Sequence, residues 1–218
     1  MRDLSTMGKA FDSESLTLNQ LHLNPFIQFE LWLDMAIAHN IPEPNAMTLS
    51  TSDANNQPNA RMVLLKKFNA TGFVFFGHYD SQKAQELAVN PKASLLFYWG
   101  GMNRQVRLKG TVRKLDKKSS AAYFRARSLE SQIAAILSPQ SKILSEALKL
   151  ALTKDYNQLL RKYQHTKQLP ACPDYWGGFK FVPHQFEFWQ GAAHRLHDRF
   201  VYEYNQSTKT WEIHQLAP

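Results

Sequence analysis

The densest group of side chains able to take part in chemistry lies between Trp189 and Arg199, near the C-terminal end of the chain. Within it, Arg195, His197 and Arg199 alternate along the sequence, so an extended segment would present all three on one face. Two guanidinium groups beside an imidazole suit a planar ligand that is electron-rich or anionic. We interpret the segment as one that binds such a ligand through arginine and histidine side chains.

Two other chemistries find no support in this segment. A zinc site at His194 and His197 would need further ligands nearby, and the sequence offers no convincing ones, so we expect no metal. Acyl transfer would need a serine in a nucleophile-elbow motif, which is missing. The glycine-rich motifs of dinucleotide and P-loop sites are missing too, so a phosphate would have to be bound by other means.

Two groups of cations could bind anions at the ends of predicted elements. Ser81 and Lys83 stand at an expected helix start, where free backbone N–H groups and the helix dipole favour a phosphate. Arg61 and Lys66 stand at the two ends of an apolar strand. The alternative in both cases is a solvated surface charge beside an ordinary helix cap or strand end.

A third group combines Tyr123 and Arg127 with Ser131. The first two are one helical turn apart and share a face, and the serine opens the next apolar stretch. A phenol, a guanidinium and a capping hydroxyl could converge on one phosphate, with the arginine binding in bidentate fashion. An aromatic–arginine stack on the surface is the competing interpretation.

The charge balance favours anionic partners. The 218 residues include 26 Lys and Arg against 18 Asp and Glu, a net charge of +8. The charge is unevenly spread, with −5 over residues 1–60 and +13 over residues 61–218. Such a body could attract nucleic acid, anionic lipid or small phosphorylated molecules. The bases are spaced along strands and helix ends rather than gathered in one basic run, so we expect neither nucleic acid nor a membrane as partner.

Several protein classes are disfavoured by the remaining composition. A single cysteine, Cys172, leaves no internal disulfide framework. No apolar run approaches the roughly 18 residues of a membrane span. The segment from Met1 to Ala10 has no apolar core of a secretory signal, so we expect a cytoplasmic protein.

The predicted helices and strands that must position these side chains occur in separate groups along the sequence. Asn24-Pro25 predicts the start of a helix over 26–39, and Ser81 the start of a second over 82–89. The run 61–66 predicts a strand covered on both faces that pairs with 73–76 in a hairpin. Segregated strands and helices favour an antiparallel α+β fold. Further strands are expected over 46–52, 93–99, 104–112, 175–182, 185–191, 200–204 and 211–216, and helices over 117–165 with an apolar stripe at Leu144, Leu148, Leu152, Leu159 and Leu160.

An ordered series of short strings carries a family resemblance. From about Asn24 to the last residue the chain resembles the pyridoxamine 5′-phosphate oxidase (pyridoxine 5′-phosphate oxidase) family, and the series holds the order and spacing of that family. The string from Arg195 to Arg199, directly after Phe-Trp-Gln-Gly, is the most specific part. The strings are Arg61-Met-Val-Leu-Leu-Lys66, Leu95-Leu-Phe-Tyr-Trp99, Arg104-Gln-Val106, Ser131-Gln-Ile133, Gln140-Ser141, Tyr175-Trp-Gly-Gly-Phe179, Glu187-Phe-Trp-Gln-Gly191, Arg195-Leu-His-Asp-Arg199 and Leu216-Ala-Pro218.

The resemblance implies a fold, a cofactor and a reaction. It implies an FMN-binding split β-barrel, antiparallel and of the α+β class, with peripheral helices. It implies a homodimer with FMN at the subunit interface. The implied enzyme is a pyridoxal 5′-phosphate synthase that oxidises pyridoxine 5′-phosphate and pyridoxamine 5′-phosphate. In that reaction a hydride passes from C4′ to flavin N5, and O2 is reduced to H2O2.

The same resemblance assigns residues by position. Arg195 and His197 would be the catalytic pair and would contact the pyridine ring. The substrate phosphate would be held by Lys66, Tyr123, Arg127 and Ser131. The FMN contacts would be Arg61, Met62, Val63, Leu64, Leu65, Lys66, Phe76, Gly77, Gln82, Lys83, Gln105, Gln140, Ser141, Trp189 and Arg199.

The chain departs from the family pattern in two places. Phe76-Gly77-His78 stands where the family commonly has Tyr-Thr-Asn, and Gln82 replaces an arginine of the flavin phosphate site. We expect weaker FMN binding from these changes. Residues 1–23 would form an N-terminal segment and candidate lid ahead of a single domain over 24–218, although the segment lacks the family's tyrosine. A related split-barrel flavin reductase and a non-catalytic carrier of FMN or pyridoxal phosphate remain alternatives.

Overall fold

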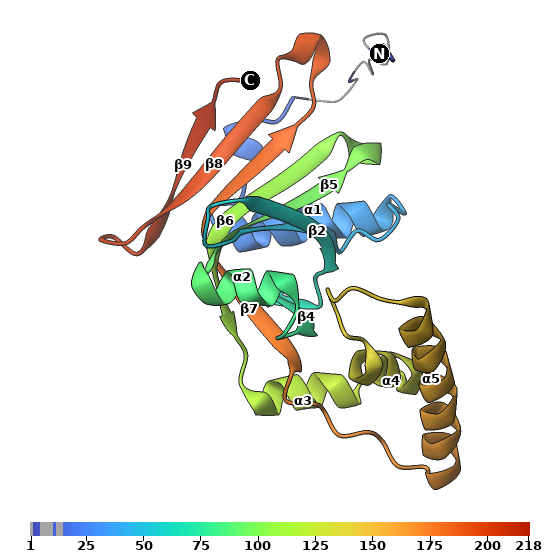
Figure 1. The fold of residues 1–218 in the computed structure, drawn as a ribbon. Helices are drawn as coiled ribbons and strands as arrows, with labels where there is room; N and C mark the ends of the chain where they lie inside the picture. The colour runs from blue at the N-terminus through green and yellow to red at the C-terminus, as the bar shows by residue number, and fades with distance from the viewer. Residues whose placement is uncertain (1, 5–10, 12–14) are drawn as a thin grey trace.

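A strongly curved antiparallel sheet forms the body of the protein (Figure 1). The structure, a computed structural model, describes residues 2–4, 11 and 15–218. Within that part, nine strands pair in the order β2-β1-β5-β6-β7-β4-β3, and β8 and β9 continue from another stretch of β7. The strands are β1 (Ala46–Ser52), β2 (Pro58–Leu64), β3 (Lys67–Asn69), β4 (Gly72–His78), β5 (Lys92–Trp99), β6 (Arg104–Lys114), β7 (Trp176–Gln190), β8 (Asp198–Asn205) and β9 (Thr210–Leu216).

Helix α1 (Pro25–Ala38) closes the core on one side of the sheet. It begins as predicted, because the Asn24 side chain accepts a hydrogen bond from the backbone N–H of Phe26, and proline fills the first helical position. Phe29 on this helix is fully buried and meets the rings of Phe73 and Phe97 edge-on at 5.0 and 4.9 Å between centroids. Burial of such aromatic side chains supplies most of the apolar surface that holds the helix to the sheet.

Strand β7 runs unbroken where the sequence predicted two strands. It spans Trp176–Gln190 and passes through Pro183, where the register with β6 shifts in a bulge between Lys109 and Gly110. Its first half pairs with β4 and its second half with β8. A bulge absorbs the proline, which cannot donate to the ladder. As a result, β7 links the end of the sheet near β4 to the end near β8 and β9.

Strand β2 contradicts two sequence predictions. It is an edge strand whose alternate residues are exposed, and Met62 is 63% exposed, so the apolar run is not covered on both faces. It pairs with β1 instead of forming a hairpin with 73–76, because β4 pairs with β3 and β7. An apolar edge strand leaves its outer face available to a ligand or to another chain.

The helical segment after β6 lies to one side of the sheet, below β4 in Figure 1. It consists of α3 (Lys117–Arg125), α4 (Leu129–Leu137) and α5 (Glu146–Thr166), with the predicted breaks at Ser128 and Pro139. The predicted leucine stripe is not buried in the single chain: Leu144, just ahead of α5, is 47% exposed, and Leu148 within α5 is 38% exposed. Helix α2 (Gln82–Val89) follows β4, and short 3-10 turns span Leu18–Gln20, Gly100–Met102 and Ala193–Arg195. None of the helices in the described residues is long and apolar enough to cross a bilayer.

Candidate active site

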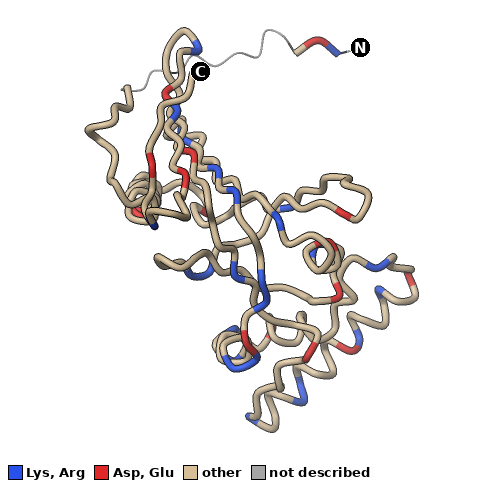
Figure 2. Tube along the Cα trace, turned by 90° about the vertical axis from the view of Figure 1, so that its left-hand side faces the viewer, with Lys and Arg blue, Asp and Glu red and all other residues tan. Residues whose placement is uncertain are grey.

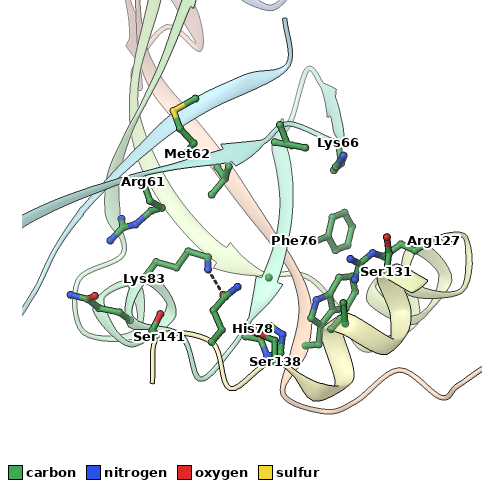
Figure 3. A pocket seen from close by; sticks show the side chains of 18 of the residues that line it. Arg61, Met62, Lys66, Phe76, His78, Lys83, Arg127, Ser131, Ser138 and Ser141 are labelled. Carbon is green, nitrogen blue, oxygen red and sulfur yellow. Dashed lines mark hydrogen bonds between the residues drawn. The ribbon is translucent and has the colours of Figure 1, made fainter. Parts of the chain in front are cut away.

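A cavity of about 970 Å³ opens between strand β2, strand β4 and the segment from α3 to Ser141 (Figure 3). Its size is at the upper end of the usual range for small-molecule sites. Most of the residues predicted to bind ligands line it, although they come from distant parts of the chain. They are Arg61, Met62, Val63, Leu64, Lys66, Phe76, Gly77, Gln82, Lys83, Tyr123, Arg127, Ser131, Gln140 and Ser141.

Arg61 reaches the cavity from the edge strand β2 and is fixed by a buried carboxylate behind it. Its Nη2 lies 3.0 Å from Oε2 of Glu86 on α2, a side chain that is almost fully buried. Its Nη1 donates to the carbonyl of Leu49 at 3.1 Å and to the Thr51 hydroxyl. The ion pair and hydrogen bonds hold the guanidinium at one end of the cavity, near the start of α2.

Lys83 is a buried cation at the same end of the cavity. Its Nζ donates to the Ser81 hydroxyl at 3.1 Å and to Oε1 of Gln140 at 2.6 Å, and no carboxylate pairs with it in the described residues. Burial, and to a lesser extent the nearby charge of Arg61, lowers the pKa of Lys83 to about 8. A cation that is desolvated in this way favours a bound anion.

Gly77 allows the close approach of Lys83. A Cβ atom at Gly77 would lie 3.1 Å from Cε and 3.3 Å from Nζ of that lysine. The glycine therefore leaves space for the ammonium group beside strand β4. The threonine of the family pattern would occupy that space.

A second cationic group lies at the other end of the cavity, around Arg127. Three aromatic rings stack there: Phe76 on Tyr123 at 3.8 Å and on Trp176 at 5.5 Å between centroids. The Arg127 guanidinium lies 4.9 Å from the centroid of Trp176, and its buried Nη1 has no hydrogen-bond partner among the described residues. An unpaired buried donor is costly, so this nitrogen is suited to a ligand that accepts hydrogen bonds.

The turn between α3 and α4 positions this second group. Ser128 caps α4 by accepting from the Ser131 N–H, so Ser131 stands within the helix rather than at its cap as predicted. The Gln132 Nε2 donates to the carbonyls of Arg125 and Arg127 at 3.3 and 2.8 Å and fixes the turn. Burial raises the pKa of Tyr123, against the opposing effect of Arg127, so the phenol stays protonated and able to donate.

Six predicted residues do not line this cavity. Leu65 points into the hydrophobic core and is 5% exposed, while its neighbours in β2 face the cavity. The other five lie at the far end of β7, where Figure 1 shows β8 well away from α3 and α4. They are Gln105, Trp189, Arg195, His197 and Arg199.

These five residues form a separate surface group across neighbouring strands. Trp189 on β7 faces Gln105 on β6 on one side and Arg199 on β8 on the other. Arg199 donates from Nε to Glu187 at 3.0 Å and from Nη1 to the carbonyl of Ala217 at 2.8 Å. These contacts fix the guanidinium against the sheet.

Arg195 and His197 sit in a tight loop rather than in an extended segment. Residues 193–195 make a 3-10 turn in which His194 and Arg195 have φ of 57° and 62°, so the predicted alternation on one face is wrong. His197 accepts a hydrogen bond at Nδ1 from the Ala192 N–H, so the neutral ring carries its proton on Nε2. Its ring lies 4.8 Å from that of Trp189. Arg195 is exposed.

Among the lining residues of the cavity that the sequence did not predict are His78 and Trp176. His78 follows Phe76 by two residues in a strand, a spacing that places both on one face. Trp176 lay inside a string used only for the family resemblance. No group of three or more His, Cys, Asp or Glu able to hold a metal occurs in the described part of the chain.

The side chains present fit a phosphorylated aromatic cofactor together with a second phosphorylated molecule. One end of the cavity supplies Arg61 and Lys83, and the other supplies Arg127 with its unpartnered nitrogen. Between them, the edge strand β2 offers apolar side chains and the backbone of Met62 to Leu64. Two separated cationic ends joined by an apolar wall suit two anionic ligands stacked side by side.

Two family models match most of the chain. The family model described as pyridoxamine 5′-phosphate oxidase matches residues 33–156. The model described as the pyridoxine 5′-phosphate oxidase C-terminal dimerisation region matches residues 176–218.

Similar proteins extend the match to the whole chain. A pyridoxine/pyridoxamine 5′-phosphate oxidase of Trichormus variabilis is 43% identical over 217 residues, covering 100% of this chain and 99% of that protein. A protein of the same name from Paraburkholderia phymatum is 43% identical over 218 residues, with both chains fully covered.

The crystal structure of PhzG from Burkholderia lata superposes with a TM-score of 0.86 at 25% identity and covers 94% of this chain and 99% of that one. A related FMN-binding protein of Nostoc punctiforme shares the fold at a TM-score of 0.67 and 16% identity, covering 87% and 97%. The predicted α+β split-barrel class is thereby confirmed, and the chain belongs to the pyridoxine/pyridoxamine 5′-phosphate oxidase family.

Proposed function

We propose that the protein oxidises pyridoxine 5′-phosphate and pyridoxamine 5′-phosphate to pyridoxal 5′-phosphate with FMN as cofactor. The observation that carries the proposal is one cavity with a cationic group at each end, around Lys83 and around Arg127. The reaction needs two phosphorylated molecules in contact, and each end can hold one phosphate. Full-length relatives that carry this name support the same activity.

In the proposed site, Arg61 and Lys83 hold the FMN phosphate, with Gln140 and Ser141 beside them. The backbone and side chains of Met62, Val63 and Leu64 line the flavin. When bound, FMN supplies at N5 the acceptor for a hydride from C4′ of the substrate, and O2 takes the two electrons to give H2O2.

The substrate phosphate is assigned to Lys66, Tyr123, Arg127 and Ser131. Arg127 can meet two phosphate oxygens with its fork of donors, and the Tyr123 hydroxyl donates a further hydrogen bond. Binding at the phosphate, remote from the reacting carbon, would orient the pyridine ring and reduce the entropy lost on the way to the transition state.

A homodimer completes the proposed site. Residues 176–218 match a dimerisation region, and they contain Trp189, Arg195, His197 and Arg199, which lie outside the cavity of their own subunit. We assign these four, with Gln105, to the cavity of the partner subunit. Arg195 would position the reacting substituent, and His197 would contact the ring and carry a proton on Nε2.

The N-terminal segment is proposed as a cover for the same composite site. Of residues 1–23, positions 1, 5–10 and 12–14 lie outside the described residues. Phe11 meets the rings of Trp189 and His197 edge-on at 5.7 and 5.2 Å, and the Leu16 N–H donates to Asp198 at 2.8 Å. These contacts place described parts of the segment beside the residues that would face a substrate.

Two measurements test the proposal. Purified protein mixed with FMN should show the shifted visible spectrum of a bound flavin. Oxygen uptake should then follow addition of pyridoxamine 5′-phosphate and yield pyridoxal 5′-phosphate with peroxide. A bound flavin without turnover of either vitamer would favour the non-catalytic carrier. Turnover only with another electron donor would favour a flavin reductase.

A further inference from the structure

His78 is a buried histidine on the wall of the cavity, and neither the proposed reaction nor the residues assigned above use it. It ends strand β4, is 5% exposed and lines the cavity beside Ser138 (Figure 3). Its ring stacks on Tyr175 at 5.7 Å with an angle of 19° between the planes. The family's common asparagine at this position cannot change its charge.

The imidazole nitrogens of His78 are available to a ligand. The hydrogen bonds that described residues make with His78 involve its backbone: its carbonyl accepts from the Ser81 hydroxyl at 2.7 Å, and its strand pairs with Trp176. Tyr175 stacks on the ring, and the His78 side chain lines the cavity, so a ligand inside the cavity can approach it. A buried imidazole with this freedom is suited to bind an anion once it is protonated.

The charged groups around His78 come from three sides. Lys83 faces it from α2, Arg127 from the turn between α3 and α4, and Asp80 from the turn after its own strand. Burial lowers the pKa of His78 most, the two cations lower it further, and Asp80 opposes them. The ring is therefore neutral near pH 7 while the cavity holds no anion.

The cofactor-phosphate end of the cavity is short of positive charge. Glu86 lies 3.0 Å from Arg61 and offsets its charge, and Gln82 contributes none. Lys83 is the remaining cation at this end among the described lining residues. The positive charge at this end is too small to balance the two negative charges of a phosphate dianion. A proton on His78 would add the missing positive charge.

We propose that His78 takes up a proton as the FMN phosphate binds, and that it acts as a pH-dependent ligand of that phosphate. The inference rests on the proposed function, because it assumes that the cavity accepts FMN. A nearby dianion stabilises the imidazolium and raises the pKa of His78 in the complex. Between the pKa of the free protein and that of the complex, binding is coupled to proton uptake, so affinity falls as the pH rises through this interval.

Calorimetric titration with FMN at pH 6.5, in buffers of different ionisation enthalpy, measures the protons taken up on binding. We expect the wild type to take up a substantial fraction of one proton more than His78→Gln and His78→Asn. Ionisation of the FMN phosphate contributes equally to all the proteins, so the difference isolates His78. Between pH 6 and pH 8, the FMN affinity of the wild type should fall roughly tenfold more than that of the variants, since one pKa unit corresponds to a factor of ten.

Three controls separate the outcomes. His184→Gln removes an exposed histidine of β7 outside this cavity and should behave as the wild type. Riboflavin lacks the phosphate and should show no difference between the wild type and the His78 variants. Titration of pyridoxal 5′-phosphate into the FMN-loaded proteins tests whether His78 responds instead to the phosphate bound at the Arg127 end of the cavity.

Equal proton uptake by the wild type and the His78 variants on binding FMN would overturn the inference and leave the proposed function intact. A difference that appears with riboflavin, or with pyridoxal 5′-phosphate alone, would equally overturn the assignment to the cofactor phosphate. Failure of the folded wild type to bind FMN at any pH would instead overturn the proposed function itself.

Discussion

The Nζ atom of Lys83 donates a hydrogen bond to Oε1 of Gln140 over 2.6 Å and so joins the start of α2 to the loop after α4 (Figure 3). The amide oxygen supplies a neutral acceptor for a buried ammonium group. A phosphate oxygen is a stronger acceptor for the same group, because both partners would then be charged. This contact therefore marks where a phosphate is most strongly favoured.

The first prediction concerns the pH dependence conferred by Lys83. Its pKa is lowered to about 8, so the free protein carries this charge below pH 8 and loses it above. FMN affinity should therefore fall as the pH rises from 7 to 9, and fluorescence quenching of FMN would measure the change. Lys83→Met should bind FMN at least tenfold more weakly, because a hydrogen bond to a charged group contributes about 1.5–3 kcal/mol. Its affinity should vary little over this range, and a decline matching that of the wild type would contradict the assignment.

The second prediction restores the missing arginine. Gln82 is exposed at the first position of α2 and lines the cavity. Gln82→Arg should tighten FMN binding several-fold, because it adds a cation beside the expected phosphate position. Gln85→Arg adds the same charge to the same helix at an exposed residue outside the cavity, and it should change the affinity far less. Equal effects of the two variants would show that only long-range charge matters.

The third prediction concerns the ion pair between Glu86 and Arg61. Glu86 also accepts hydrogen bonds from Thr51 and Asn59, so its loss leaves a half-buried guanidinium without its counter-charge. Glu86→Gln should lower the free energy of unfolding by about 2 kcal/mol, measured by urea denaturation. Saturating FMN should reduce this loss, since its phosphate would take over the role of counter-charge. Glu203→Gln, a change on an exposed residue of β8, should leave the stability nearly unchanged.

The fourth prediction tests whether each active site draws on two subunits. Arg195→Ala should slow turnover far more than it weakens FMN binding, and Arg127→Ala should raise the KM for the phosphorylated substrate strongly. At a substrate concentration where both variants are nearly inactive, their mixed dimers should regain activity, because one of the two sites in such a dimer holds both arginines. If the mixture stays as inactive as its components after subunit exchange, the residues serve the same subunit.

Local patterns in the sequence determined most of the elements and the family. Asn24-Pro25 begins α1 as expected because a cap and a proline act within one turn. Val106 and Leu108 are fully buried on β6 because side chains alternate in a strand. The ordered strings suggested the family, and a family model and relatives that match the whole length of the chain confirm it.

Tertiary structure alone decided which of these residues meet. The pairing of β2 with β1 puts Arg61 at an edge, and the packing of α2 puts Glu86 behind it. The positive φ angles of the 193–195 turn break the alternation that the sequence suggested for Arg195 and His197. Spacing within a segment follows from backbone geometry, whereas the meeting of distant segments depends on how sheet pairing and burial compete over the whole chain. For that reason the sequence could predict candidate ligand-binding residues, whereas only the fold showed that they divide between a cavity and a separate surface.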